Sequence, residues 1–313
     1  MDAAQQIIEF LFERMQIDDD WAVKQPGRFE WWAGPLAQRI WATPPRDVQG
    51  VTVTTIHIET DLLREVPSTA EVFTRLAGLN RLCSLSAYVA NTDTGKVQLH
   101  ASVSVTEDNW PLARALALHA MALQVADAHM EAEPLAGVFG AAVDATAHPD
   151  TGRRKDLDEM LGVLSIYEER GEGGSPFTTE EFAGLVHLEP RPWKTASSSR
   201  AGLEAELEFR TGSPVSRLTL DGAFRHPALG AGLLIRLALP VEPDPTIVQK
   251  LNAAERVLPD GHQLGGWAVD EEQELVCSVF IPAAAHVPNL MRALVYHMSA
   301  RNDWAAELLF PSA

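Results

Sequence analysis

The chain has 313 residues, of which 46% are hydrophobic, enough for a buried core in each of two domains of ordinary size. Its 25 Lys and Arg stand against 43 Asp and Glu, so the formal charge is −18. This charge repels a phosphate backbone and an anionic membrane surface, and we expect neither nucleic acid nor a membrane as a partner. The apolar runs are too short to span a bilayer and the N-terminus has no secretory pattern, so we predict a cytoplasmic protein.

Cysteine is too scarce for a disulfide framework. Cys83 and Cys277 are the two cysteines, and they form no metal-ligand spacing. We interpret both as reduced thiols in the core.

The first half predicts an order of helix, three strands, helix, two strands and helix. The second helix begins with a capping box at Ser68 and Glu71, and the last helix contains the string Arg114-Ala-Leu-Ala-Leu-His119. The first helix is expected at residues 5–15, and the strands at 28–32, 36–42, 51–58, 85–90 and 97–105.

About forty residues of different character follow. Apolar residues at helical spacing predict two connecting helices, at 134–143 and 156–170. The loops 146–154 and 171–176 are rich in Gly, Pro and charge, which makes them candidates for a hinge.

The second half predicts the same order of elements. A capping box at Thr178 and Glu181 opens a helix at 179–187, and Asp244 followed by Pro245 opens the next one. The last helix contains Arg292-Ala-Leu-Val-Tyr-His297. The strands are expected at residues 203–210, 215–220, 233–239, 266–269 and 274–281.

These two halves predict a tandem duplication. The apolar positions of the first inner helix return 175 positions later, and each final helix carries Arg-Ala-Leu-x-x-His. We therefore expect an α+β fold with a first unit at 1–130, a helical linker at 131–176 and a second unit at 177–313. Each unit would be an antiparallel sheet of about five strands with helices mainly on one face, and a pseudo-two-fold axis would relate the units.

Motifs for chemistry are missing from the sequence. It contains no Gly-x-Ser-x-Gly elbow, no phosphate loop ending in Gly-Lys-Ser/Thr and no His-Glu-x-x-His. We interpret His119 and His297 as core residues, the stretch 171–175 as a linker and the run 18–20 as a solvated loop. We therefore predict no catalytic residue, no metal ligand and no cofactor.

One pair of strands differs between the halves. In strand 97–105 the alternate residues Gln98, His100, Ser102 and Ser104 give one sheet a polar back, which we expect to be uncovered. In strand 274–281 both faces are largely apolar, so the back of the second sheet must be covered. Either other parts of the chain pack there, or a partner segment binds in a groove. The candidate partner-binding residues are Trp267, Cys277, Val279 and Ile281.

The element order from Gln5 to Val125 and from Thr178 to Asp303, including both Arg-Ala-Leu-x-x-His helices, resembles the superfamily of type III secretion chaperones and YbjN-like proteins. The two-lobed acidic architecture also resembles the chaperones of ESX secretion. The first resemblance implies a non-enzymatic chaperone or adaptor that binds a protein or peptide client. Its relatives commonly dimerise, so this chain would be either a monomer with internal pseudo-symmetry or a homodimer. The alternatives are a scaffold or regulatory protein without a client, and a small-ligand-binding protein or enzyme.

Overall fold

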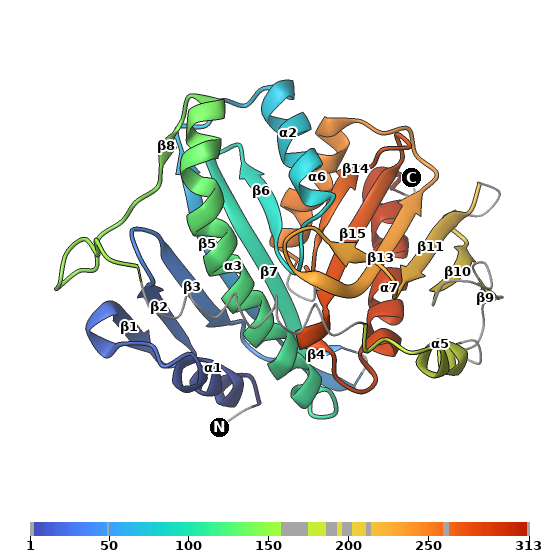
Figure 1. The fold of residues 1–313 in the computed structure, drawn as a ribbon, viewed down its shortest axis with the longest axis horizontal. Coiled ribbons are helices and arrows are strands. Elements are labelled where there is room, and N and C mark those ends of the chain that lie inside the picture. Colours follow the sequence, from blue (N-terminus) through green and yellow to red (C-terminus); the bar gives the residue numbers. More distant parts are fainter. Residues whose placement is uncertain are drawn as a thin grey trace. The chain divides into compact units, whose positions relative to one another are not determined.

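The structure, a computed structural model, describes residues 3–48, 50–157, 175–185, 193–195, 202–210, 214–258 and 263–311. The fold is α+β, as predicted, with two antiparallel sheets (Figure 1). Within these residues, no helix combines the length and the apolar character needed to cross a membrane.

The chain divides into two compact units. The first consists of Met1–Leu76, Leu85–Leu164 and Asn252–Leu264, and the second of Ala77–Ser84, Ser165–Leu251 and Gly265–Ala313. Each unit therefore includes a short segment from the other half of the sequence. The division expected from the sequence, with units at 1–130 and 177–313 and a linker at 131–176, gives each unit one continuous segment. That division remains a prediction.

The first unit contains an eight-stranded sheet, more than the five strands expected. Its strands run in the order β1-β2-β3-β5-β7-β6, and β4 and β8 each pair with β5. The strands are β1 (Ala22–Gln25), β2 (Arg28–Trp32), β3 (Ala37–Ala42), β4 (Arg46–Val48), β5 (Val51–Arg64), β6 (Ala87–Asn91), β7 (Lys96–Val105) and β8 (Ala142–Val143).

Helices α1 (Ala3–Arg14) and α3 (Trp110–Phe139) pack against this sheet (Figure 1). Ile58 and Leu99 belong to the apolar residues of β5 and β7 and are fully buried. Helix α3 runs without interruption through Pro134, so the separate helix predicted at 134–143 is wrong. Proline breaks the helical bonding of one turn, but the apolar residues on both sides of Pro134 share the buried face of α3.

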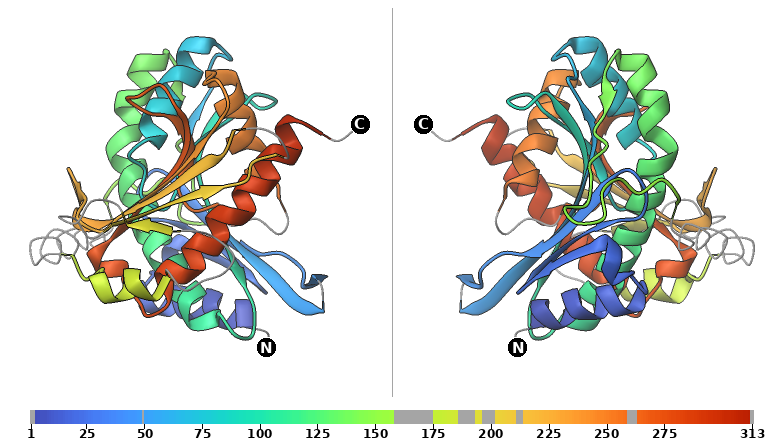
Figure 2. Two further views of the ribbon diagram at one scale, coloured as in Figure 1. Left: turned by 90° about the vertical axis from the view of Figure 1, so that its right-hand side faces the viewer. Right: turned by 90° about the vertical axis from the view of Figure 1, so that its left-hand side faces the viewer.

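Strand β5 extends beyond the region predicted for it. Its first residues pair with β4 in a hairpin that projects from the rest of the sheet (Figure 2). Val48 and Val51, at the end of this hairpin, are exposed.

Polar side chains cross-link α3 to the apolar face of the sheet. Gln124 of α3 is fully buried, and its amide group donates to the carbonyl of Ile58 at 3.0 Å and to Ser86 at 3.1 Å. Its Oε1 accepts from Thr60 at 2.8 Å and from Gln38 at 3.0 Å. A buried amide is tolerated here because all of its hydrogen-bonding capacity is used.

We predict that Gln124→Leu lowers the free energy of unfolding by about 2–3 kcal/mol, because it leaves buried polar partners unpaired. Gln6→Leu, on the exposed side of α1, is the matched control and should change it by less than about 0.5 kcal/mol. Urea titration of the two variants and the wild type measures both values. Equal effects would contradict the role given to the Gln124 bonds.

The second unit contains a seven-stranded sheet, in the order β14-β15-β13-β11-β10-β9, with β12 paired to β13. The strands are β9 (Trp193–Thr195), β10 (Gly202–Leu207), β11 (Ser216–Asp221), β12 (Arg225–His226), β13 (Gly230–Leu239), β14 (Gly266–Val269) and β15 (Leu275–Pro282). The helices of the second half are α5 (Thr179–Leu185), α6 (Pro245–Arg256) and α7 (Leu290–Leu309), and α2 (Ala70–Asn80) precedes β6. The residues after Leu76 in α2 belong to the second unit, and those after Leu251 in α6 belong to the first.

The two sheets have the same order of connection. Read from β9, the second sheet is β9-β10-β11-β13-β15-β14, which repeats β1-β2-β3-β5-β7-β6 with a helix before β1 and β9 alike. The additional strands β4 and β12 also correspond, since each pairs with the long strand that follows it.

The predicted helix starts are mostly correct. The Thr178 hydroxyl accepts from the Glu181 backbone at 3.3 Å, and the Glu181 carboxylate accepts from the Thr178 backbone at 3.3 Å, which confirms that capping box. The Asp244 carboxylate accepts from the Thr246 backbone at 2.6 Å, with Pro245 opening α6. Helix α2 instead begins one residue later than predicted, because Thr69 rather than Ser68 accepts from the Val72 backbone. Most of the helix predicted at 156–170 and the loop at 171–174 lie outside the described residues.

Candidate functional site

The four residues predicted to bind a partner lie in the core of the second unit. Trp267 of β14 pairs with Cys277 of β15, which also carries Val279 and Ile281, and all four are 0% exposed. Arg301 of α7 donates to the Cys277 sulfur at 2.9 Å. These residues therefore present no surface to a partner in this structure, and a groove at this place remains a prediction. Cys83 and Cys277, both among the described residues, are buried and are not joined by a disulfide, as expected.

The back of the second sheet is covered by the chain itself. The Ser84 hydroxyl donates to the carbonyl of Phe280 at 3.0 Å, and the Ser278 hydroxyl donates to the carbonyl of Arg81 at 3.0 Å. The covering segment belongs to the same compact unit as the sheet. Both faces of β15 are therefore buried, which accounts for their apolar residues.

The expectation of an uncovered polar back on the first sheet is wrong. Gln98, His100, Ser102 and Ser104 are all buried, with His100 and Ser102 at 0% exposure. Gln263 exchanges two bonds with Ser102: the Gln263 backbone donates to the hydroxyl at 2.8 Å, and the Ser102 backbone donates to the Gln263 carbonyl at 3.0 Å. The alternation of residues within one strand cannot reveal a cover from residues as distant in sequence as Arg256 and Gln263.

This covered region, the polar face, consists of the residues of β3, β5 and β7 that lie on the side opposite α3. At its centre the Glu59 carboxylate accepts from Arg39 at 2.5 Å, from Gln98 at 3.1 Å and from Arg256 at 2.7 Å. The Glu59 side chain is only 4% exposed. A carboxylate at this depth needs such partners, because an unpaired buried charge is strongly destabilising.

A second carboxylate extends the network toward β8. Asp61 accepts from Arg39 at 2.8 Å and from Lys96 at 2.8 Å, and Lys96 also pairs with Asp144 at 2.6 Å. Burial would raise the pKa of Asp61, but Arg39 and Lys96 outweigh it and lower that pKa. Burial opposes the charged form of Arg39 as well, and Asp61 and Glu59 overcome it and raise the pKa of Arg39.

Two histidines lie beside this network. The Trp41 ring stacks on His57 at 5.0 Å between centroids, and Nδ1 of His57 lies 3.1 Å from Nε2 of His100. Nδ1 of His100 contacts Oε1 of Gln263, whose amide nitrogen donates to the Asn252 carbonyl. An amide oxygen only accepts, so His100 donates through Nδ1 and accepts from His57 through Nε2. The His100 ring makes both of these bonds in its neutral form.

Burial is the main cause of the low basicity of both histidines. It lowers the pKa of His57 to about 4, with a further contribution from the nearby Arg256 charge. Burial and the neighbouring His57 hold the pKa of His100 well below its usual range. The groups around the pair are Trp41 and Arg39 from β3, Glu59 from β5, and Arg256 and Gln263 from the covering segment.

We predict that the free energy of unfolding falls as the pH decreases from 6.5 toward 4. The unfolded chain binds a proton at His57 in this range and the folded chain does not, so acid favours unfolding by about 3 kcal/mol for this residue. Urea titrations at several pH values measure the slope. The slope should be smaller for His57→Gln, and an unchanged slope in this variant would rule out His57 as its source.

The outer edge of the first sheet is strand β1, which among the described residues pairs only with β2. The connecting turn is Pro26-Gly27, and Gly27 has a φ of +70°, as a type II turn requires. In a hairpin with a two-residue turn, the two residues that flank the turn, here Gln25 and Arg28, are a hydrogen-bonded pair. Along an antiparallel ladder such pairs alternate with pairs that are not hydrogen-bonded, so Lys24 and Phe29 form a non-bonded pair. The backbone N–H and C=O of Lys24 therefore point away from β2, into the open edge.

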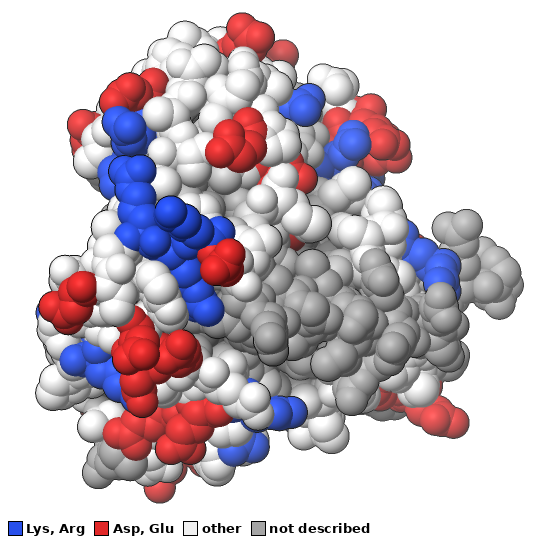
Figure 3. Space-filling view, turned by 60° about the vertical axis from the view of Figure 1, so that its left-hand side comes forward, with Lys and Arg blue, Asp and Glu red and all other residues white. Residues whose placement is uncertain are grey.

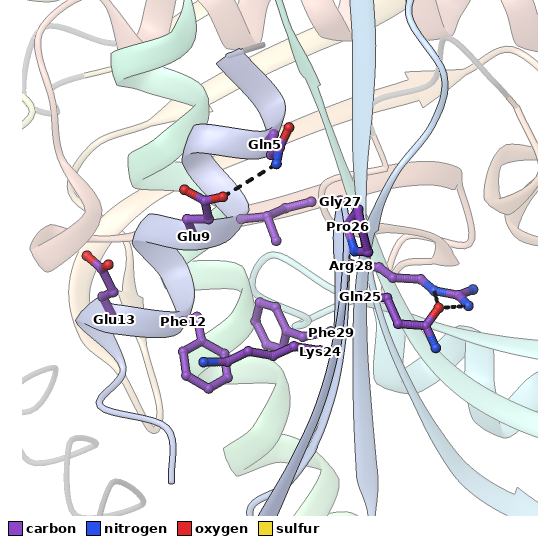
Figure 4. A pocket seen from close by; sticks show the side chains of 11 residues that line it. Gln5, Glu9, Phe12, Glu13, Lys24, Gln25, Pro26, Gly27, Arg28 and Phe29 are labelled. Carbon is purple, nitrogen blue, oxygen red and sulfur yellow. Dashed lines mark hydrogen bonds between the residues drawn. The ribbon is translucent and has the colours of Figure 1, made fainter. Parts of the chain in front are cut away.

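Each face of this edge has a pocket. On the polar side, a pocket of about 390 Å³ is lined by residues that include Glu30, Arg39 and Trp41. Burial raises the pKa of Glu30 against the opposing charge of Arg39. On the other side, a pocket of about 310 Å³ lies between α1 and the β1–β2 hairpin (Figure 4). We call this second pocket the α1 pocket.

Charge is unevenly distributed over the surface. On the face shown in Figure 3, some of the Lys and Arg side chains form a strip and others lie singly, while Asp and Glu side chains lie in separate groups. In the second unit, carboxylate oxygens of Asp270, Glu272 and Glu274 lie within 4.8 Å of one another. Asp270 accepts from the backbones of the other two, as expected for a tight acidic turn between strands.

Sequence reasoning missed the β1 edge. The one signal was the Pro26-Gly27 pair before strand 28–32, which marks a turn and therefore a strand on its other side. His119 and His297, expected in the core, are half-buried on α3 and α7.

Comparisons of the chain with protein-family models, with curated proteins and with solved structures find no match.

Proposed function

We propose that this protein is a non-enzymatic module that binds an extended segment of a protein or peptide client at the open edge of β1. The observation that carries the proposal is an edge strand whose backbone N–H and C=O at Lys24 face outward, with a pocket on each side of the sheet. An added strand would bond to this edge and direct its side chains alternately to the two pockets.

The position of the edge limits where the client would pair. The Thr151 hydroxyl donates to the Asp20 carbonyl at 3.2 Å, so the chain before β1 already has a contact there. The Ala22 N–H is used by the carbonyl of Asp19. Pairing would therefore involve the Ala22 carbonyl and both backbone groups of Lys24.

We further propose that the chain arose by tandem duplication of a unit resembling secretion chaperones and YbjN-like proteins. The matching strand order of the two sheets supports it, and a pseudo-two-fold arrangement of the units belongs to the same proposal. In such proteins a client, rather than a substrate, is the expected partner.

A second candidate is a small-ligand-binding protein. It is favoured by the pocket at Glu30, Arg39 and Trp41, whose volume of about 390 Å³ lies in the range of small-molecule sites. A peptide selection separates the two candidates, because a site for a small molecule does not depend on the backbone N–H of Lys24.

We expect random heptapeptides displayed on phage to be enriched on the full-length protein, and the enriched peptides to bind about tenfold more weakly to Lys24→Pro. Proline removes the outward N–H, and an edge strand tolerates it. Lys24→Thr is the matched control, because it changes the side chain and keeps the N–H. Binding constants of synthetic peptides for the three proteins measure the effect.

The proposal is wrong if no peptide is enriched, or if the enriched peptides bind Lys24→Pro and Lys24→Thr equally. Circular dichroism and thermal unfolding check that both variants are folded. Weaker binding to Lys24→Pro than to Lys24→Thr, which also lacks the lysine ammonium, then reports the missing donor.

A further inference from the structure

We propose that the α1 pocket binds a lysine or arginine side chain of the client, so that the preferred segment is extended and basic. This inference rests on the proposed function and names the chemistry of its ligand. It concerns only the first unit, in the region drawn in Figure 4.

The floor of the α1 pocket is aromatic. Phe12 of α1 and Phe29 of β2 meet edge to face, with ring centroids 5.3 Å apart. Both rings line the pocket although most of their surface is buried. An aromatic face attracts a cation through its quadrupole, and the aliphatic stem of a long basic side chain packs well on such a floor.

The ammonium group of Lys24 already occupies part of the α1 pocket. The Lys24 ammonium lies 3.4 Å from the centroid of Phe12 and pairs with Asp19 at 2.7 Å (Figure 4). The Lys24 side chain is half exposed, so this contact is replaceable. Its ammonium shows where the charge of an incoming side chain is stabilised.

Carboxylates along α1 complete the pocket. Glu9 and Glu13 are one helical turn apart on α1 and belong to the residues that line the pocket, and both are exposed. Glu9 accepts from Gln5 at 3.4 Å, and no described residue pairs with Glu13. Two like charges at this spacing repel each other, and a bound cation would relieve the repulsion.

The remaining charges fit the same ligand. Arg28, at the rim, is held by Gln25, whose Oε1 accepts from the Arg28 Nε at 2.6 Å. The formal charge of −18 over the whole chain attracts a basic segment and repels a second copy of this chain. We therefore infer a basic partner segment rather than self-association through β1.

The test uses fluorescein-labelled Val-Lys-Val-Lys-Val-Lys, with Val-Gln-Val-Gln-Val-Gln as the neutral probe, and measures anisotropy with the full-length protein. The lysine peptide should bind more tightly than the neutral peptide. The double variant Glu9→Gln/Glu13→Gln should weaken binding of the lysine peptide about tenfold and leave binding of the neutral peptide unchanged. Lys24→Thr should strengthen binding of the lysine peptide about threefold, because it removes the competing Lys24 ammonium.

The matched control is Glu65→Gln/Asp93→Asn. It removes two acidic charges near the β6–β7 turn, where the Val66 backbone donates to the Gly95 carbonyl, at the opposite edge of the sheet from β1. The inference is overturned if this control weakens the lysine peptide as much as Glu9→Gln/Glu13→Gln does, or if the neutral peptide binds equally well. Edge binding that depends on the Lys24 N–H without any preference for basic peptides would overturn this inference and leave the proposed function standing. Binding of neither probe together with a failed peptide selection would overturn both.

Discussion

The first unit depends on the neutralisation of a buried polar sheet face. Glu59 and Asp61 on β5 are nearly inaccessible, and their charges are balanced by Arg39 from β3, Lys96 from β7 and Arg256 from the end of α6. A burial of this kind is stable only when every charge has a partner. The segment 252–264 is therefore an integral part of the first unit although it lies far away in sequence.

The two units exchange short segments, and each exchanged segment bonds to the sheet of the unit that it joins. In the second unit Ser84 donates a hydrogen bond to β15 and the Arg81 carbonyl accepts one from it, and in the first unit Gln263 bonds to β7. These residues lie in segments that include the last residues of α2 and α6. The backs of both sheets are thereby covered by segments of the chain, with a charge pair between Arg256 and Glu59 in addition in the first unit.

Closing the backs of the sheets leaves the edges as the places where backbone groups remain available. Natural proteins protect such edges because they pair readily with other strands. At β1 the protection is slight: a strand of four residues and one lysine that folds over Phe12. A pocket on each side gives the edge a means to select side chains, which distinguishes a binding edge from a merely exposed one.

The sequence by itself determined the α+β class, most strands within a few residues, the capping box at Thr178 and the N-cap at Asp244. These features depend on alternation, helical spacing and local hydrogen bonds, all of which act between residues close in the chain. Tertiary structure decided that the polar residues of β7 are buried, that Trp267 and Cys277 are core residues, and that α3 continues through Pro134. Each of these depends on segments distant in sequence that pack together, and a side chain's own neighbours along the chain carry no record of what will cover it.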